Sequence, residues 1–181
     1  MSRMFAYFSV MLAIFLSGCQ GQHEKIGDPN KQVILIGTKH FPASLAGTWR
    51  SEEEKVEVTL DKNGRLKEAV ITPGWINVTP NHTTTVEMKN GSMGIYQVGD
   101  CPVTYIKESN ELTVEINVER IYIPFPSDHI EGSVKQVFVG HLNPEMNEWQ
   151  ATWFNLFDYG PRLPMDPNGL GSPITFIKKQ S

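Results

Sequence analysis

The sequence predicts an all-β fold, either a barrel or a sandwich of about eight to ten antiparallel strands. Several short segments alternate apolar and polar residues, which is the period of a half-buried strand. Turn-forming pairs such as Asn63-Gly64 and Asn90-Gly91 separate these segments. In addition, ten of the 12 prolines lie between positions 73 and 173 and interrupt nearly every stretch long enough for a helix.

The first expected strand is the apolar run Val-Ile-Leu-Ile at residues 33–36. The next is residues 56–60, where apolar and polar side chains alternate. Residues 61–64 then have the sequence Asp-Lys-Asn-Gly, which predicts a hairpin turn because Asn and Gly tolerate a positive φ. Residues 65–72 are expected to return as the paired strand.

A second hairpin is expected between residues 83–88 and 93–96, around the second Asn-Gly pair. Residues 112–119 form the most regular amphipathic strand, with four aliphatic side chains on one face and four polar side chains on the other. At Arg120 the apolar register shifts by one residue, which predicts a β-bulge or a bend.

The C-terminal part predicts a strand pair at residues 134–142 and 149–158, and a closing strand at 174–177. Residues 158–171 contain prolines and glycines that exclude regular structure, together with apolar side chains that a solvated loop does not need. We expect an ordered loop there, either packed across one end of the domain or presented to a partner. A structural crossover that covers an open end is the alternative.

The N-terminus has the organisation of a secretory signal. Arg3 precedes an apolar segment at residues 4–16 that contains no charged residue. This segment is shorter than the ~20 residues that a membrane-spanning helix needs. It ends in the sequence Leu-Ser-Gly-Cys at residues 16–19, and the polar residues 20–31 that follow are expected to form a tether.

The sequence Leu-Ser-Gly-Cys resembles the lipobox of bacterial lipoproteins. The resemblance implies that residues 1–18 are a cleaved signal peptide and that Cys19 carries acyl chains, palmitate among them, which hold the protein at a membrane. Gln20, in place of the Asp found elsewhere in the family, implies the outer membrane, facing the periplasm, in a Gram-negative host. An ordinary secretory peptide with a chance cysteine, or an uncleaved anchor, is the alternative.

The chain is therefore expected to consist of a signal peptide (1–18), a lipidated N-terminus with its tether (19–43) and a β-domain (44–181). Cleavage removes Arg3 alone among the 16 basic and 20 acidic residues, so the net charge changes from −4 to −5. Such an acidic protein is not expected to bind nucleic acid. Once Cys19 is acylated, no intramolecular disulfide is possible, and Cys101 is expected to be a small buried side chain.

Residues 45–50, Leu-Ala-Gly-Thr-Trp-Arg, resemble the Gly-x-Trp opening of the lipocalins and avidin-like calycins. In that family the glycine lets the chain turn into the first strand, and the tryptophan closes one end of the barrel. The resemblance, carried by Gly47 and Trp49, implies a lipocalin-like, antiparallel up-and-down β-barrel. A β-sandwich is the alternative.

A barrel of this size holds one small apolar ligand if its own side chains do not fill the interior. The expected function is therefore that of a membrane-anchored envelope lipoprotein that binds a small hydrophobic ligand or lipid. The alternative is a structural or protein-interaction lipoprotein with a filled core and an envelope protein as its partner. The side chains expected to line the barrel interior are Trp49, Tyr96, Tyr105, Tyr122, Phe138 and Trp153.

The sequence lacks the Gly-x-Ser-x-Gly motif of serine hydrolases and the glycine-rich loops that bind phosphate. The protein is therefore expected to be non-enzymatic and to use no cofactor. The nearest approach to a metal site is the set His129, Glu131 and His141, which offers nitrogen and oxygen ligands if the fold brings them together. Their spacing alone does not predict a site.

Overall fold

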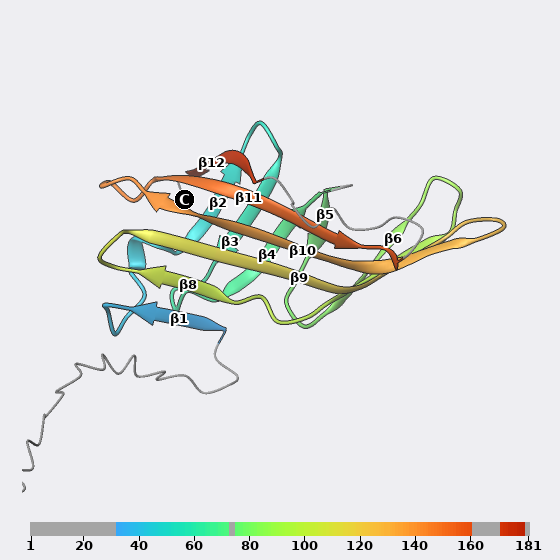
Figure 1. The fold of residues 1–181 in the computed structure, drawn as a ribbon, viewed down its shortest axis with the longest axis horizontal. Helices are drawn as coiled ribbons and strands as arrows, with labels where there is room; N and C mark the ends of the chain where they lie inside the picture. The colour runs from blue at the N-terminus through green and yellow to red at the C-terminus, as the bar shows by residue number, and fades with distance from the viewer. Residues whose placement is uncertain (1–31, 73–74, 161–170, 180–181) are drawn as a thin grey trace, which may run out of the picture.

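The computed structural model describes residues 32–72, 75–160 and 171–179. Within these ranges, twelve strands form one mixed sheet, and the one helix is a three-residue 3₁₀ helix, η1. The predicted all-β class is therefore confirmed (Figure 1). In chain order the elements are β1 Val33–Ile36, η1 Ala43–Leu45, β2 Gly47–Ser51, β3 Val56–Leu60, β4 Leu66–Ile71, β5 Ile76–Val78, β6 Thr83–Glu87, β7 Met93–Val98, β8 Val103–Ile106, β9 Glu111–Pro124, β10 His129–Leu142, β11 Glu148–Asp158 and β12 Ser172–Lys178.

The strands follow the order β1-β8-β9-β10-β11-β12-β2-β3-β4-β5, and β7 and β6 branch from β9. The branch arises because β9 is 14 residues long, so that its first part pairs with β8 and its later part pairs with β7. In Figure 1, β8 to β11 form a front layer and β2 to β4 cross behind it. The sheet thus curls into two layers that face each other across one core.

The sheet does not close into a barrel. No strand pairing joins β5 to β6 in the described residues, although the Thr84 hydroxyl of β6 donates a hydrogen bond of 3.3 Å to the Asn77 carbonyl of β5. β5 has only three residues, and the chain turns after it through Asn81, where φ is 60°. This gap between β5 and β6, called the seam below, leaves the predicted closed barrel unconfirmed.

β1 departs from the predicted up-and-down arrangement because it pairs with β8 in parallel. Leu35 of β1 packs against the core. Phe41, which follows β1, is 8% exposed and meets the ring of Tyr105 edge-on at 6.2 Å. Because these apolar side chains are removed from water, β1 and Phe41 pack with the sheet, although the sequence analysis assigned residues 19–43 to the lipidated N-terminus and tether.

Both predicted Asn-Gly hairpins are confirmed. In the first turn, Gly64 has a φ of 84°, and the Asp61 carboxylate accepts hydrogen bonds from the backbone N–H groups of Asn63 and Arg65. A Cβ atom at Gly64 would lie 2.5 Å from the ring of Phe41. Glycine is therefore required at this position both for its backbone conformation and for space.

The predicted bulge at Arg120 is confirmed. Buried and half-buried residues alternate from Leu112 to Val118, and then Glu119 and Arg120 are both exposed before Ile121 is buried again. The register of β9 against β10 shifts at the same point. The bulge therefore keeps the apolar side chains of both halves of β9 directed into the core.

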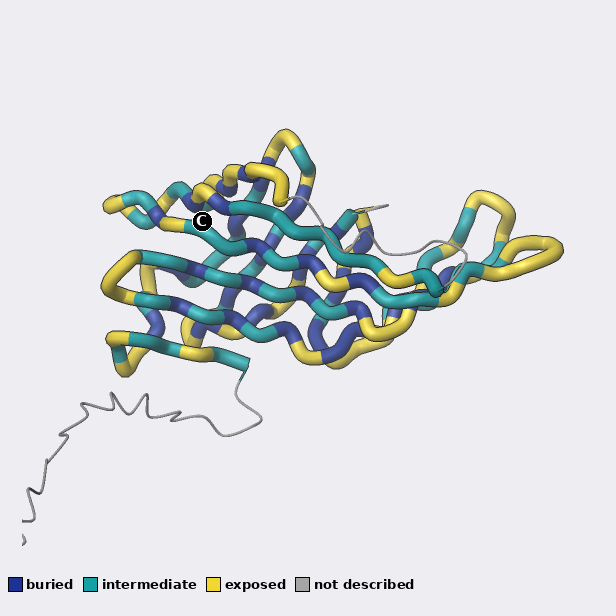
Figure 2. The backbone as a smooth tube through the Cα atoms, in the orientation of Figure 1, coloured by how far each residue is buried: buried dark blue, intermediate teal, exposed yellow. Residues whose placement is uncertain are grey.

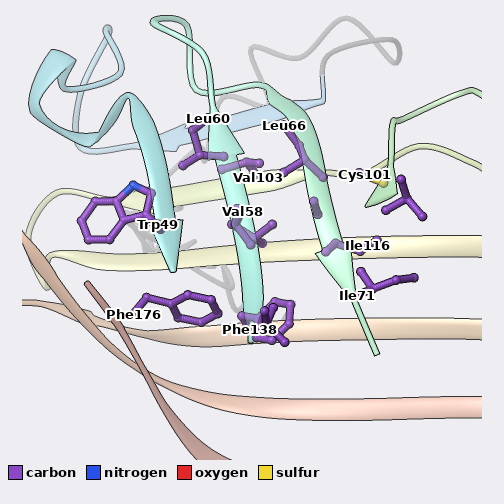
Figure 3. Packing of buried hydrophobic residues seen from close by; sticks show 14 of the residues in the cluster. Trp49, Val58, Leu60, Leu66, Ile71, Cys101, Val103, Ile116, Phe138 and Phe176 are labelled. Carbon is purple, nitrogen blue, oxygen red and sulfur yellow. The ribbon is translucent and has the colours of Figure 1, made fainter. Parts of the chain in front are cut away.

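The core lies between the two layers of the sheet. Figure 2 shows the alternation of buried and less buried residues along the long strands, which is the pattern of a sheet with one face in the core. Figure 3 shows side chains of β2, β3 and β4 facing those of the front layer. No helix within the described ranges has the length and hydrophobicity needed to cross a membrane.

Candidate functional site

One end of the core is filled by aromatic side chains that pack on one another. Trp149 and Phe176 stack with ring centroids 4.7 Å apart, and Phe138 meets Phe176 edge-on at 5.3 Å. Trp49 meets Trp149 edge-on at 6.4 Å. Each of these side chains is 0% exposed, and Figure 3 labels three of them. We call the set the aromatic cluster: Trp49, Phe138, Trp149 and Phe176.

The aromatic cluster contains two of the side chains that were expected to line a ligand pocket. The indole Nε1 of Trp49 donates a buried hydrogen bond of 2.9 Å to the Leu45 carbonyl, which fixes the orientation of the ring. Phe138 lies against Phe176 and stacks on Trp153, another of the expected lining residues, at a centroid distance of 6.1 Å. These rings contact other rings of the core, as core side chains do.

Two of the tyrosines that were expected to line the interior, Tyr105 and Tyr122, have their ring contacts outside the aromatic cluster. Tyr105 is 1% exposed, and its hydroxyl donates a hydrogen bond of 3.2 Å to the Asn110 side chain. Tyr122 lies on the outer side of β9, because its neighbours Ile121 and Ile123 face the core. Its expected place in the interior is therefore wrong, since successive side chains of a strand point to opposite faces.

Tyr96 does line an internal cavity. Its side chain is 7% exposed, and the cavity has a volume of about 30 Å³. Tyr159 lines the same cavity. Burial raises the pKa of both hydroxyls, and the nearby Tyr159 raises the pKa of Tyr96 further. Both groups are therefore neutral near pH 7 and can donate and accept hydrogen bonds.

Cys101 is a buried thiol, as expected from the sequence. It is 0% exposed, and its Sγ atom lies 3.6 Å from the Gly99 carbonyl, to which it donates a hydrogen bond. Burial raises the pKa of Cys101 to about 11. The thiolate, which is the reactive form of cysteine, is therefore scarce near pH 7.

The three residues considered as metal ligands do not all lie close enough together to bind one ion. Nε2 of His129 lies 4.0 Å from the Glu131 carboxylate at the start of β10. His141 lies near the other end of this 14-residue strand, where its Nδ1 atom is 3.1 Å from the Ser109 carbonyl. The two histidines are thus roughly 40 Å apart along the strand. Within the described residues, no group of three or more His, Cys, Asp or Glu side chains is arranged to hold a metal ion.

The β6–β7 and β9–β10 hairpins extend beyond the core as a protruding arm (Figures 1 and 2). At its end, the Ser92 hydroxyl lies 2.7 Å from the Asn90 side-chain oxygen and 3.2 Å from the Pro124 carbonyl, so its one proton is shared between an acceptor in its own hairpin and one on the other hairpin. Met93 and Phe125, which follow Ser92 and Pro124, are 47% and 46% exposed. We call these four residues the arm tip, and its surface is apolar.

Side-chain contacts brace the arm just behind its tip. Arg120 Nε donates a hydrogen bond of 2.7 Å to the Glu131 carboxylate, which joins β9 to β10. The Arg120 guanidinium also lies 5.8 Å from the ring centroid of Tyr122, and the His129 ring lies 5.2 Å from the same ring. Tyr122, first considered for a ligand pocket, and His129 and Glu131, first considered for a metal site, thus contact one another or Arg120 in this part of the arm.

A hollow of about 350 Å³ crosses the outer surface of β9, β10 and β11 at the bulge. Asn117, Lys135 and Leu156 are cross-strand neighbours in it. The Lys135 ammonium group forms an ion pair of 2.5 Å with the Glu115 carboxylate. The hollow is open to solvent, so it is a surface groove and not an enclosed site.

The sequence reasoning did not identify Gln136. This residue is 0% exposed on β10, and its Nε2 atom donates a hydrogen bond of 2.5 Å to the Thr72 carbonyl. The same atom lies 3.4 Å from the Asn155 side-chain oxygen. A signal was available, because Gln136 occupies an inward position between Val134 and Phe138 in the alternation of its strand.

Two sequence predictions lie outside the described residues: the acylated Cys19, and residues 161–170 of the expected ordered loop. No protein-family model, curated protein or solved structure matches this chain. Its resemblance to bacterial lipoproteins therefore stays a prediction from residues 16–19, and its resemblance to lipocalins stays a prediction from residues 45–50.

Proposed function

We propose that this protein is a lipid-anchored envelope protein whose β-domain acts by contacting another protein. The aromatic cluster is the observation that carries this proposal, because its rings pack on one another instead of surrounding a pocket. Small-molecule pockets measure roughly 300–1,000 Å³. The internal cavity beside Tyr96 measures about 30 Å³. A filled core favours the protein-interaction function over the carriage of a hydrophobic ligand or lipid.

We also propose that the domain is a lipocalin-like barrel left open at the seam. The antiparallel pairing that runs from β9 through β12 to β2 and on to β5 supports this shape. The buried Trp49, which follows Gly47 at the start of β2, supports it as well. The parallel β1 is an addition that an up-and-down barrel does not have.

The proposed anchor is the acylated Cys19, placed on the periplasmic side of the outer membrane in a Gram-negative host. The support is the sequence Leu-Ser-Gly-Cys at the end of the apolar segment. β1 begins at Val33. The residues between Cys19 and β1 can therefore reach over roughly 45 Å when fully extended. The domain would work within that distance of the membrane surface.

Replacement of the anchor residue tests this part of the proposal. A Cys19→Ser variant is expected to keep its signal peptide and to incorporate no radiolabelled palmitate, because the acyl chain is attached to the thiol. The matched control is Cys101→Ser, which should be labelled as strongly as the unaltered chain. Normal cleavage and labelling of the Cys19→Ser variant would contradict the anchor.

The arm tip is the contact surface that we propose for the partner protein. Met93 and Phe125 expose apolar side chains at the end of an arm braced behind them. The flanking charged residues, such as Glu87, Lys89 and Asp128, carry both signs, so they form no basic patch for anionic lipid. An apolar centre with a polar rim is the usual composition of a protein interface.

Photo-crosslinking tests the arm tip in the full acylated chain. A photoreactive residue in place of Phe125, and separately in place of Met93, is expected to capture one and the same protein in the host envelope. The matched control position is Lys107, which is exposed in the turn between β8 and β9, at the other end of β9. Equal capture from Lys107, or different proteins from the two tip positions, would refute the arm tip as the contact surface.

A further inference from the structure

An internal cavity lies behind the seam, at a distance from the aromatic cluster. Its volume is about 30 Å³. One wall comes from β4, β5 and the turn between them, on one side of the seam, and the other wall comes from β7, β9, β10 and the residue after β11. Four isoleucines and Val134 form the apolar part of the lining, and its polar residues are Thr72, Tyr96 and Tyr159.

Two buried polar atoms, one on the cavity wall and one beside it, have no hydrogen-bond partner among the described residues. They are the Thr72 hydroxyl and the Gln136 side-chain carbonyl oxygen. The two residues are in direct contact, because Gln136 Nε2 donates its hydrogen bond to the Thr72 backbone carbonyl. Buried polar groups of native proteins are nearly always bonded to protein or to ordered water. The Thr72 hydroxyl belongs to a residue that lines the cavity, so it is placed to bond to a molecule there.

The two tyrosines bring further hydrogen-bonding groups to the cavity from the other side of the seam. Tyr96 lies on β7, and Tyr159 follows the last residue of β11. Each hydroxyl is able to donate one hydrogen bond and to accept others. A molecule in the cavity therefore has polar partners on both of its walls.

We propose that this cavity is a water-binding site in which one or two ordered water molecules link Thr72 to the tyrosine hydroxyls across the seam. A cavity needs roughly 10–15 Å³ to hold a water molecule, and such a water has two to four polar partners. The observed volume, about 30 Å³, meets this requirement and excludes any lipid. The bound water would join Thr72, which follows β4, to the tyrosines on β7 and after β11, between strands that do not pair with each other.

The variant Thr72→Val tests the site, because it removes the hydroxyl and keeps nearly the same side-chain volume. If the hydroxyl binds water, the melting temperature of the full acylated chain should fall by about 2–4 °C, the shift typical of one lost hydrogen bond at this chain length. If the hydroxyl is unpartnered, valine removes a buried unsatisfied group, and the melting temperature should rise or stay the same. The direction of the shift thus separates the two cases.

The matched control is Thr104→Val, at a position on β8 whose side chain points away from the core, between the inward-facing Val103 and Tyr105. This variant should show no comparable fall. If Thr72→Val does not fold, Tyr96→Phe takes its place, because it removes a hydroxyl from the opposite wall of the cavity. A fall that is no greater than that of the control, or a rise, would overturn the proposal.

A crystal structure of the unaltered chain at a resolution better than about 2 Å provides a second readout. We expect electron density for a water oxygen within hydrogen-bonding distance of the Thr72 hydroxyl, with a tyrosine hydroxyl or the Gln136 oxygen as a further partner. A cavity without such density would overturn the proposal regardless of the melting temperatures. The proposal does not depend on the lipid anchor or on the arm tip.

Discussion

Cys101 links burial in the core to the pH dependence of stability. Its pKa is raised by burial from 9.0 to about 11, so the folded protein keeps a proton that the unfolded chain loses at lower pH. This contribution to stability is fully present below pH 9 and is lost as the pH rises towards 11. A shift of this size corresponds to about 2–3 kcal/mol.

We therefore expect Cys101→Ala to flatten the alkaline limb of the stability curve. Between pH 8 and pH 11, the unaltered protein should lose about 2–3 kcal/mol more of its free energy of unfolding than the variant does. Urea unfolding at a series of pH values measures this difference. The buried tyrosines are present in both proteins and therefore cancel in the comparison. A difference between the two proteins that stays constant over this range would contradict the assignment.

At the scale of residues, the sequence predicted which apolar side chains are buried more reliably than it predicted which residues they contact. Trp49, Tyr105 and Phe138 are buried as expected. Alternation along a strand gives the face on which a ring lies, but it does not say whether the opposite face supplies another ring or a void. Tyr122 lies on the outer face because the bulge at Arg120 turns Ile121 and Ile123 into the core, a placement that the predicted bulge already implied.

At the scale of elements, β1 is an edge strand. The carbonyls of Gln32 and Ile36 accept hydrogen bonds from the β8 side. In a parallel ladder alternate residues bond to the neighbour, so the backbone groups of Val33 and Leu35 point to the free edge. Ile34 adds a side chain that is 50% exposed. An apolar edge strand without a charged side chain is a site for unwanted pairing with another chain.

We expect Ile34→Lys to reduce self-association of the full chain without unfolding it. The side chain is half exposed, so the free energy of unfolding should change by no more than about 0.5–1 kcal/mol. Sedimentation velocity at high protein concentration measures the effect. The matched control is Thr104→Lys on β8, the residue directly opposite Ile34 in the ladder but one strand away from the edge. An equal reduction in the control would show that added charge, and not the edge, is responsible.

The hairpins were predictable because each depends on residues close in the sequence. The turn at Gly64 and the bulge at Arg120 each follow from a few adjacent residues. β5, with three residues, was missed because so short a strand shows too little alternation to be recognised. The parallel pairing of β1 with β8 joins residues about 70 positions apart in the sequence, and no local pattern reports such a contact.

At the scale of the whole molecule, the interior and the exterior have different roles. The aromatic cluster occupies one end of the core, and the cavity behind the seam at the other end has room only for water. The surfaces left for contact with other molecules are the arm tip, the hollow at the bulge and the edge of β1. This distribution favours the proposed function of contacting another protein through the surface.

The sequence by itself determined the all-β class, the hairpins, the bulge and the burial of Trp49, because these depend on local turn chemistry and on the period of apolar residues. Tertiary structure alone decided that the sheet stays open at the seam, that β1 belongs to the domain and that the aromatic rings meet one another. It also separated His129 from His141 and placed Gln136 against Thr72. These outcomes depend on which distant residues meet when the sheet curls, and the order of residues along one strand does not contain that information.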